Sequence, residues 1–434
     1  MAALSPLAAL RVAALPYSGS VALQDKLFAR LSGARFVLLG EATHGTHEFY
    51  RERAAITKRL IAEAGFHAVA IEGDWPDTYR VHRYVAGESD DASAADALSG
   101  FRRFPTWMWR NADVLDFVGW LRAHNEALPR AERVAFFGLD LFSMYASIAA
   151  ILSYLERHDP EAAQHARERY ACFEHFSEDA QTYGYATALA LAPSCEQQVL
   201  EQLLELESRP ADDDERFDAI QNARLVMNAE AYYRRMFGGR ISTWNLRDRH
   251  MTDTLEAIAK ELERRVRRPK IVVWAHNTHL GDARATQMKA VGEYNIGQLL
   301  RERYGRDVAS VGFTTYEGTV IAARDWDAPA EFRRINPALP GSWEALLHEL
   351  RLPRVVLLCD QAPLRLALGH PRLQRAIGVV YRPRSERSSH YFQAQLVDQF
   401  DAVVHIDHSR AVEPLERVAE ELPVEPPETY PFAV

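Results

Sequence analysis

Short apolar runs alternate with longer amphipathic segments along most of this chain. The amphipathic segments carry apolar residues three and four positions apart, which is the helical period. Strands that alternate with helices predict an α/β fold with a mainly parallel central sheet flanked by helices. The runs expected to be strands are residues 35–39, 68–71, 133–137, 270–275, 308–313, 355–358, 376–381 and 402–406.

Residues 141–265 break this alternation. Stretches such as YASIAAILSYLERH and CEQQVLEQLLELESR keep the helical period, and we expect no strand among them. Composition marks no domain boundary in the 434 residues. We therefore expect one domain over residues 1–434, with an α/β core of about 30–140 and 266–410. The stretch 141–265 forms a large all-helical insertion over one side of the sheet.

Polar side chains follow each of the first four expected strands. They are Glu41 and His44 after the first, Glu72 after the second, Asp140 after the third, and His276 and His279 on a loop after the fourth. Ligands of open α/β sheets lie outside the carboxyl ends of the strands, so we expect these groups along one edge. An ordinary loop hydrogen bond would explain any single one, Asp140 above all. It does not explain the whole set.

The residue types in this set favour activation of water. The chain contains no GxSxG, HExxH, Walker or GxGxxG motif. An imidazole, with an ordinary pKa of ~6.5, can take a proton from water when a carboxylate orients its other nitrogen. Zinc or a similar cation is the alternative, because histidine and glutamate are also metal ligands. The spacing of His276 and His279 does not favour it, so we expect no metal site and no cofactor.

Composition and net charge limit the classes of partner that this chain is expected to bind. The net charge is −9, from 51 basic and 60 acidic residues without a basic run, which argues against nucleic acid. No run approaches the ~20 apolar residues of a membrane span, and the N-terminus lacks the features of a signal peptide. We therefore expect a cytoplasmic protein with no membrane partner. Cys172, Cys195 and Cys359 are too widely spaced for a thiol-rich metal site, and Cys359 is expected in the core.

Two further segments offer candidate substrate contacts. The segment FRRFPTWMWRN carries tryptophans that either pack in the core or line a pocket, and SERSSHYFQAQLVDQFD is polar and aromatic. Their candidate substrate-binding residues are Trp107, Trp109, His390 and Tyr391. The charged run at 247–249 is expected to be a solvated ion cluster.

Five segments together resemble the erythromycin esterase family. They are GEATHGTHEFYRER, AIEGDWPD, WNLRDRHM, VVWAHNTHLGDAR and YRPRSERSSHYFQAQL, of which the first and fourth are the specific ones. The resemblance covers residues of about 34–408 and implies an α/β core with a helical portion. It also implies a hydrolase that opens the ester of a macrolide lactone by activating water, without a covalent acyl-enzyme. The catalytic residues it implies are His44, Glu41, Arg53, Glu72, His276 and His279, and Arg53 enters only in this way.

The expected function is a carboxylic-ester hydrolase acting on a small molecule, a macrolide or another bulky lactone or ester. His44 takes the proton from water, and Glu41 or Glu72 orients it. Arg53 holds a carboxylate or polarises the ester carbonyl. His276 and His279 bind the substrate oxygen or donate to the leaving alcohol. Three alternatives stay open: a metal-dependent hydrolase on the same scaffold, a haem- or ligand-binding ChaN-like protein without esterase activity, and a transferase in which an alcohol or amine replaces water.

Overall fold

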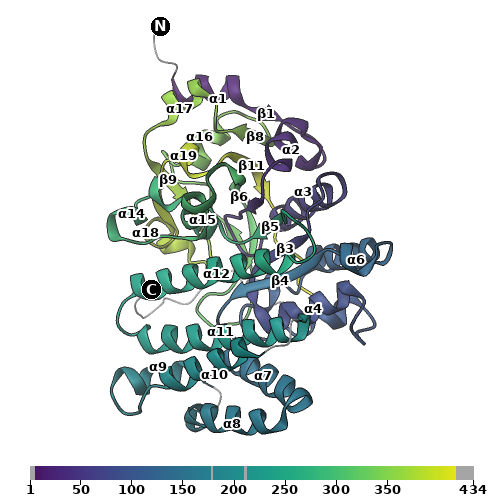
Figure 1. Ribbon diagram of the computed structural model, residues 1–434. Coiled ribbons are helices and arrows are strands. Elements are labelled where there is room, and N and C mark those ends of the chain that lie inside the picture. Colours follow the sequence, from purple (N-terminus) through teal and green to yellow (C-terminus); the bar gives the residue numbers. More distant parts are fainter. Residues whose placement is uncertain (1–4, 177–178, 210–212, 417–434) are drawn as a thin grey trace. The chain divides into compact units, whose positions relative to one another are not determined.

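The computed structural model describes residues 5–176, 179–209 and 213–416 (Figure 1). Its main sheet has the strand order β1-β8-β11-β6-β2-β5-β3-β4, with β7 paired to β6. The pairs β2–β5, β2–β6 and β6–β11 are parallel, whereas β1–β8, β8–β11 and β6–β7 are antiparallel. The sheet as a whole is mixed but mostly parallel, which confirms the expected α/β fold.

The chain comprises two compact units. The first consists of Met1–Val69, Tyr84–Ala135 and Arg268–Val434, and the second of Ala70–Arg83 and Phe136–Arg267. In the first unit the strands are β1 (Leu15–Pro16), β2 (Phe36–Leu39), β5 (Ile271–Trp274), β6 (Val308–Ala322), β7 (Glu331–Ile335), β8 (Arg354–Leu358), β9 (Arg372–Arg375), β10 (Tyr391–Ala394) and β11 (Ala402–Ser409). Its helices are α1 (Pro6–Ala13), α2 (Asp25–Ser32), α3 (His47–Ala64), α5 (Ala94–Leu98), α6 (Ala112–Glu126), α13 (Asn277–Leu280), α14 (Met288–Val291), α15 (Ile296–Tyr304), α16 (Trp343–His348), α17 (Ala362–Leu368), α18 (Glu386–Ser389) and α19 (Leu396–Gln399).

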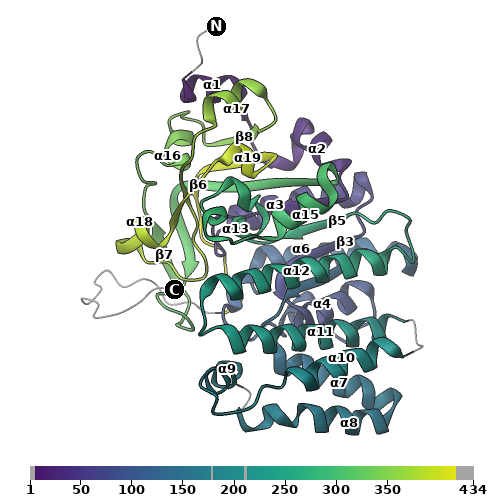
Figure 2. The ribbon, with the colours of Figure 1, turned by 60° about the vertical axis from the view of Figure 1, so that its left-hand side comes forward.

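Strand β2 lies at the centre of the first unit. All four of its residues are buried, and it is hydrogen-bonded on one side to β5 and on the other to β6. A strand covered on both faces is continuously apolar, which explains the run FVLL. Figure 2 shows the long strand β6 continuing beyond this region to β7, with which it pairs from Gly318 onward. The turn that follows β2 is thus held between two neighbouring strands.

Helix α3 carries the second half of the first motif. It ends at Gly65, whose φ of 64° and ψ of 52° are left-handed, and the backbone N–H of Gly65 donates to the carbonyl of Leu60. Glycine adopts this conformation without a steric penalty, so it stops the helix where the sequence predicts. The buried face of α3 includes Glu52 and Arg53 among apolar residues.

Several expected strand boundaries differ from the structure. Strand β6 runs from Val308 to Ala322, where a strand over 308–313 was expected. Strand β3 (Ala68–Asp74) and strand β4 (Ala135–Asp140) extend further than their apolar runs, so Glu72 and Asp140 lie within strands. Gly138 permits this extension, because a Cβ there would lie 2.4 Å from the carbonyl oxygen of Gly73. The run 376–381 is not a strand. It makes only isolated bridges, to Thr43 and Ala323. It also packs into an apolar cluster of Val320, Ala322, Ile335, Ile377 and Tyr381.

The helical insertion lies in the second unit, which also contains most of β3, β4 and most of α4 (Trp75–Ala86). Its helices are α7 (Met144–His158), α8 (Pro160–Tyr170), α9 (Ala180–Ala188), α10 (Glu196–Ser208), α11 (Asp214–Arg235) and α12 (Arg240–Leu262). Helix α11 packs against α7, α9, α10 and α12 (Figure 1). The described residues of this stretch form no strand, as the sequence predicts.

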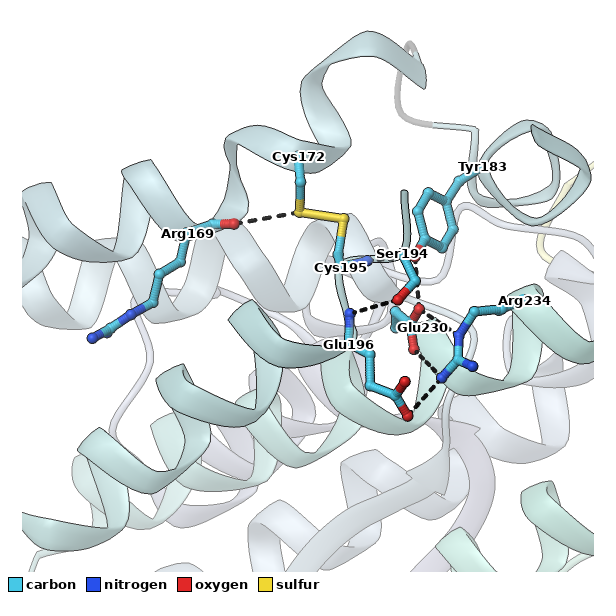
Figure 3. Close-up of a disulfide and its surroundings, with 8 residues drawn as sticks. All are labelled: Arg169, Cys172, Tyr183, Ser194, Cys195, Glu196, Glu230 and Arg234. Atoms are coloured by element: carbon cyan, nitrogen blue, oxygen red, sulfur yellow. Dashed lines mark hydrogen bonds and ion pairs between the residues drawn. A yellow bond between two sulfur atoms is a disulfide. The ribbon is translucent and has the colours of Figure 1, made fainter. Parts of the chain in front are cut away.

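A disulfide joins two parts of the insertion that the sequence did not connect. Cys172 and Cys195 are bonded, and their Cα atoms are 6.1 Å apart (Figure 3). The backbone N–H of Cys195 donates to the hydroxyl of Tyr183, which donates to Glu230 at 2.6 Å. The pair is more typical of an oxidising compartment than of the cytoplasmic location expected from the sequence. Cys359 is buried in an apolar cluster, as expected.

In the described part of the chain, no helix combines the length and apolarity needed to cross a membrane.

Candidate active site

Two glycines shape the turn after β2 by permitting close approach. A Cβ on Gly40 would lie 2.1 Å from Oδ1 of Asn277, and one on Gly45 would lie 2.0 Å from the carbonyl oxygen of Ile321. Neither glycine has a positive φ, so their role is space and not backbone freedom. The turn that carries Glu41 and His44 is consequently pressed against the segment after β5 and against β6.

A buried chain of three charged or ionisable side chains starts at this turn. Nη2 of Arg53 donates to Oε2 of Glu41 at 2.6 Å, and Nδ1 of His44 lies 2.9 Å from Oε1 of the same carboxylate. Arg53 and Glu41 are 0% exposed, and the side chain of His44 is 8% exposed. The carboxylate therefore holds the imidazole on one oxygen and the guanidinium on the other.

Two aromatic rings face the guanidinium of Arg53. Its guanidinium carbon lies 4.4 Å from the ring centroid of Tyr50 and 5.2 Å from that of Trp274. Its Nε and Nη1 are buried and have no hydrogen-bond acceptor among the described residues. A guanidinium can be buried when a carboxylate and aromatic faces compensate it. Glu41 is therefore the carboxylate that holds the charge of Arg53 in the protein interior.

Tyr50 and His276 complete the surroundings of His44. The hydroxyl of Tyr50 donates to the carbonyl oxygen of His44 at 3.0 Å, and the ring of His276 lies 4.9 Å from that of His44. His276 caps α13: its Nδ1 accepts from the backbone N–H of Thr278 at 3.3 Å and lies 2.8 Å from Oγ1 of the same residue, whose hydroxyl can donate to it. A neutral imidazole that accepts at Nδ1 carries its proton at Nε2. His276 can therefore act as a hydrogen-bond donor beside His44.

Only one of the two histidines after β5 lies on a loop, where the sequence places both. His276 is the N-cap of α13, and His279 belongs to that single turn of helix. Both are buried. The loop prediction was wrong for His279, because capping by His276 lets a four-residue segment close into a helical turn.

Glu72 belongs to the second unit, where it joins a different ion cluster. Nη2 of Arg247 donates to Glu72 at 2.8 Å, and Nε and Nη2 of Arg247 hold Asp140 at 2.9 and 2.6 Å. Burial opposes the charge of Arg247, but the two carboxylates outweigh it and raise the pKa of the guanidinium well above its ordinary value. The side chain is only 17% exposed, so the prediction of a solvated cluster was wrong for Arg247.

The two candidate tryptophans are buried. Trp107 packs edge-on against Phe104 with ring centroids 5.4 Å apart, and Trp109 packs edge-on against Tyr50 at 6.2 Å. This arrangement corresponds to the core alternative. Trp109 supports the ring that in turn contacts Arg53, whereas contact of either tryptophan with substrate stays a prediction.

His390 and Tyr391 take part in a buried network around Arg375. Nε of Arg375 donates to the hydroxyl of Tyr391 at 2.8 Å, and Nε2 of His390 accepts from the backbone N–H of Arg382 at 3.0 Å. Burial raises the pKa of Tyr391 to about 12 and lowers that of His390 to about 4. The network holds β10 to its surroundings, and substrate binding by these residues stays a prediction.

The lowered pKa of His390 predicts a dependence of stability on pH. The unfolded chain titrates near ~6.5, so the buried neutral form contributes fully above that pH, and the contribution is lost as pH falls toward about 4. The loss amounts to about 2–3 kcal/mol. We expect His390→Gln, which keeps a hydrogen-bond acceptor, to show a smaller fall in unfolding free energy between pH 6.5 and 4.5. Urea titrations at both pH values measure it.

His408→Gln serves as the control for that comparison, because the side chain of His408 is 62% exposed. Its unfolding free energy should follow the wild-type pH dependence. Parallel curves for wild type and His390→Gln would contradict the burial argument.

Among the described residues, no group of three or more His, Cys, Asp or Glu side chains is arranged to hold a metal ion. Sequence reasoning overlooked Tyr50 and Asn277 as parts of these clusters, and it placed Arg247 in a solvated cluster. Asn277 stands between the two histidines of the HNTH segment, and Arg247 lies in WNLRDRHM, so the motifs themselves carried the only signal for both.

The family comparison agrees with this fold and these motifs. The sequence model of the erythromycin esterase family matches residues 61–409, so the chain belongs to that family. Membership indicates a hydrolase with a small-molecule substrate. The matched range begins after the turn that carries Glu41 and His44.

Curated relatives are distant. YbfO of Bacillus subtilis (strain 168), which carries a provisional hydrolase designation, is 22% identical over 400 residues, 87% of this chain and 84% of that protein. Erythromycin esterase type II of Escherichia coli is 20% identical over 311 residues, 67% of this chain and 71% of that protein.

Solved structures share the fold. A succinoglycan biosynthesis protein has a TM-score of 0.77 at 20% identity, covering 94% of this chain and 97% of that one. A Bacillus cereus protein has a TM-score of 0.75 at 20% identity, covering 95% and 98%. An erythromycin esterase mutant in its open conformation has a TM-score of 0.65 at 18% identity, covering 89% and 93%.

Proposed function

We propose that this chain is a carboxylic-ester hydrolase in which His44 activates water for direct attack on the ester. The observation that carries the proposal is the contact of 2.9 Å between Nδ1 of His44 and Glu41, whose second oxygen is held by Arg53. A carboxylate on Nδ1 fixes the tautomer in which Nε2 accepts a proton, and it stabilises the imidazolium that forms.

The reaction then proceeds in two steps. Nε2 of His44 takes a proton from water while the water oxygen bonds to the carbonyl carbon, which gives a tetrahedral oxyanion. The oxyanion collapses, the carbon–oxygen bond to the alcohol breaks, and the imidazolium returns its proton to the leaving oxygen. One water is consumed, and one acid and one alcohol group are produced without a bond between enzyme and substrate.

His276 is the donor that we assign to the oxyanion. Its ring lies beside that of His44, and we assign it the tautomer in which Nδ1 accepts from Thr278 and Nε2 carries the proton. A fixed donor aimed at developing negative charge lowers the barrier more than a mobile water does, because it needs no reorganisation. His279 is a second candidate donor on the same helical turn.

We assign different roles to the two glutamates of the proposal. Glu41 receives the orienting role because it touches His44, and Arg53 receives the role of holding that carboxylate. Glu72 accepts from Arg247, and the proposal gives it no separate step. Arg247 and the two acids make a rigid group at the ends of β3 and β4.

We further propose a macrolide lactone or a similarly bulky ester as the substrate, because one curated relative is named an erythromycin esterase. The test is incubation with erythromycin in chelator, followed by mass spectrometry. We expect a product heavier by one water, and in ¹⁸O-water the label should appear in the new carboxylate. No reaction would remove the macrolide from the proposal.

A panel of aryl esters and lactones tests ester hydrolysis independently of the proposed macrolide substrate. Hydrolysis of any member by the wild-type protein would support the esterase, and failure on the whole panel would contradict it. If chelator abolished the activity and zinc restored it, the proposed mechanism would change. Hydrolysis would then be metal-assisted, and His44 alone would not activate the water.

A further inference from the structure

Asn277 reaches across the end of β2 to the strand on its far side. Strand β2 separates β5 from β6 and stops at Leu39. Asn277, which follows β5, donates from Nδ2 to the carbonyl oxygen of Phe313 on β6 at 2.7 Å. Its Oδ1 accepts from the backbone N–H of Phe313 at 3.3 Å. The side-chain amide thus takes the place that another residue of β2 would occupy.

The backbone of the same residue holds the turn that carries the base. The N–H of Asn277 donates to the carbonyl oxygen of Glu41 at 2.8 Å. Asn277 also directly follows His276, the cap of α13. One buried residue therefore connects the backbone of Glu41, the donor histidine and the central strand β6.

The side-chain position of Asn277 requires a glycine at position 40. Its missing side chain leaves the space that Oδ1 of Asn277 fills, since a Cβ there would lie 2.1 Å from that oxygen. The next contacts of such a Cβ are at 3.2 Å, to Cγ of Asn277 and to the carbonyl oxygen of Val311. A methyl group at position 40 would consequently displace the amide before it disturbed the strand.

We propose that Asn277 is a positioning residue that sets the Glu41–His44 pair against His276. This proposal rests on the function proposed above, because it assigns Asn277 to the geometry of that reaction. A displacement of about 1 Å in such an arrangement can lower a rate by about 10²-fold.

Asn125 provides a matched control. It is buried on α6, donates from Nδ2 to the carbonyl of Val134 at 2.9 Å and accepts from the N–H of Val134 at 2.8 Å. We expect Asn277→Ala and Asn125→Ala to lower the urea midpoint by comparable amounts. Only Asn277→Ala should lower kcat, by about 10- to 100-fold, with KM changed less than about threefold. Equal kcat losses, or wild-type kcat in Asn277→Ala, would overturn the proposal.

Gly40→Ala tests the contact itself. Alone it should lower kcat about as much as Asn277→Ala, whereas adding it to Asn277→Ala should cost less than about twofold more. Multiplicative losses in the double variant would show that the two positions act independently and would overturn the proposed connection.

One readout needs no substrate. NMR of the ring Nδ1 of His44 reports its contact with Glu41, and we expect that signal to shift in Asn277→Ala and Gly40→Ala but not in Asn125→Ala. If the wild type hydrolysed no ester, the proposed function would fail, and this signal would still decide the positioning role. An unmoved signal would overturn it.

Discussion

His44→Asn is expected to lower kcat for ester hydrolysis by about 10²–10⁴-fold, the usual contribution of a general base. Asparagine is polar, as histidine is, but its amide cannot take a proton from water at neutral pH. Its amide can still donate toward Glu41, so the buried carboxylate keeps a partner. The loss should therefore appear in turnover and not in folding. Steady-state kinetics and the urea midpoint of the same preparation measure both.

His47→Asn is the matched control for this change. His47 lies three residues further along the chain, and its Nδ1 contacts Oδ2 of Asp113 at 2.8 Å, so it forms a second histidine–carboxylate pair. We expect kcat of His47→Asn to stay within about twofold of wild type, because the proposal gives that pair no proton to transfer. Full turnover in His44→Asn would remove the assigned base.

Arg53→Met should produce the largest loss of stability. It removes the cation from a pair that is 0% exposed and leaves Glu41 as an uncompensated buried charge. Breaking a buried ion pair in this way costs about 3–5 kcal/mol. Equilibrium unfolding in urea measures the loss. The exposed pair Arg157–Glu215 supplies the comparison, since Arg157→Met should change the unfolding free energy by less than about 1 kcal/mol.

The double variant Glu41→Gln with Arg53→Met separates stability from catalysis. Removing both charges should recover much of the unfolding free energy, because no buried charge is left unpaired. Turnover should stay low, because an amide does not stabilise the imidazolium as a carboxylate does. If Arg53→Met cost no more stability than Arg157→Met, the buried pair would not be the ionic contact that the distances indicate.

Much of the fold could be predicted because strands and helices have different apolar periods. The run FVLL became β2, Gly65 ended α3 as expected, and the described residues of 141–265 are helical. The run 376–381 was the exception, because an apolar segment buried by packing has the same composition as a buried strand. The boundaries of β3 and β4 depended on the close approach at Gly138, which composition does not record.

The candidate site, like the fold, could be predicted from the sequence only in part. Strand-end reasoning selected Glu41, His44 and His276, and the resemblance added Arg53. Neither could choose between Glu41 and Glu72 as the partner of His44. That choice depends on which carboxylate the fold brings within hydrogen-bond distance, and the contacts are 2.9 Å from His44 to Glu41 and 2.8 Å from Arg247 to Glu72.

The sequence by itself determined the periodic elements, the family motifs and the residue types that activate water. Tertiary structure decided three long-range facts: the burial of Arg53 against Glu41, the connection from Asn277 to β6, and the disulfide between Cys172 and Cys195. The physical reason is that apolar period and turn chemistry act between neighbours along the chain. Contacts between distant segments depend on how strands align and which small residues allow their backbones to meet.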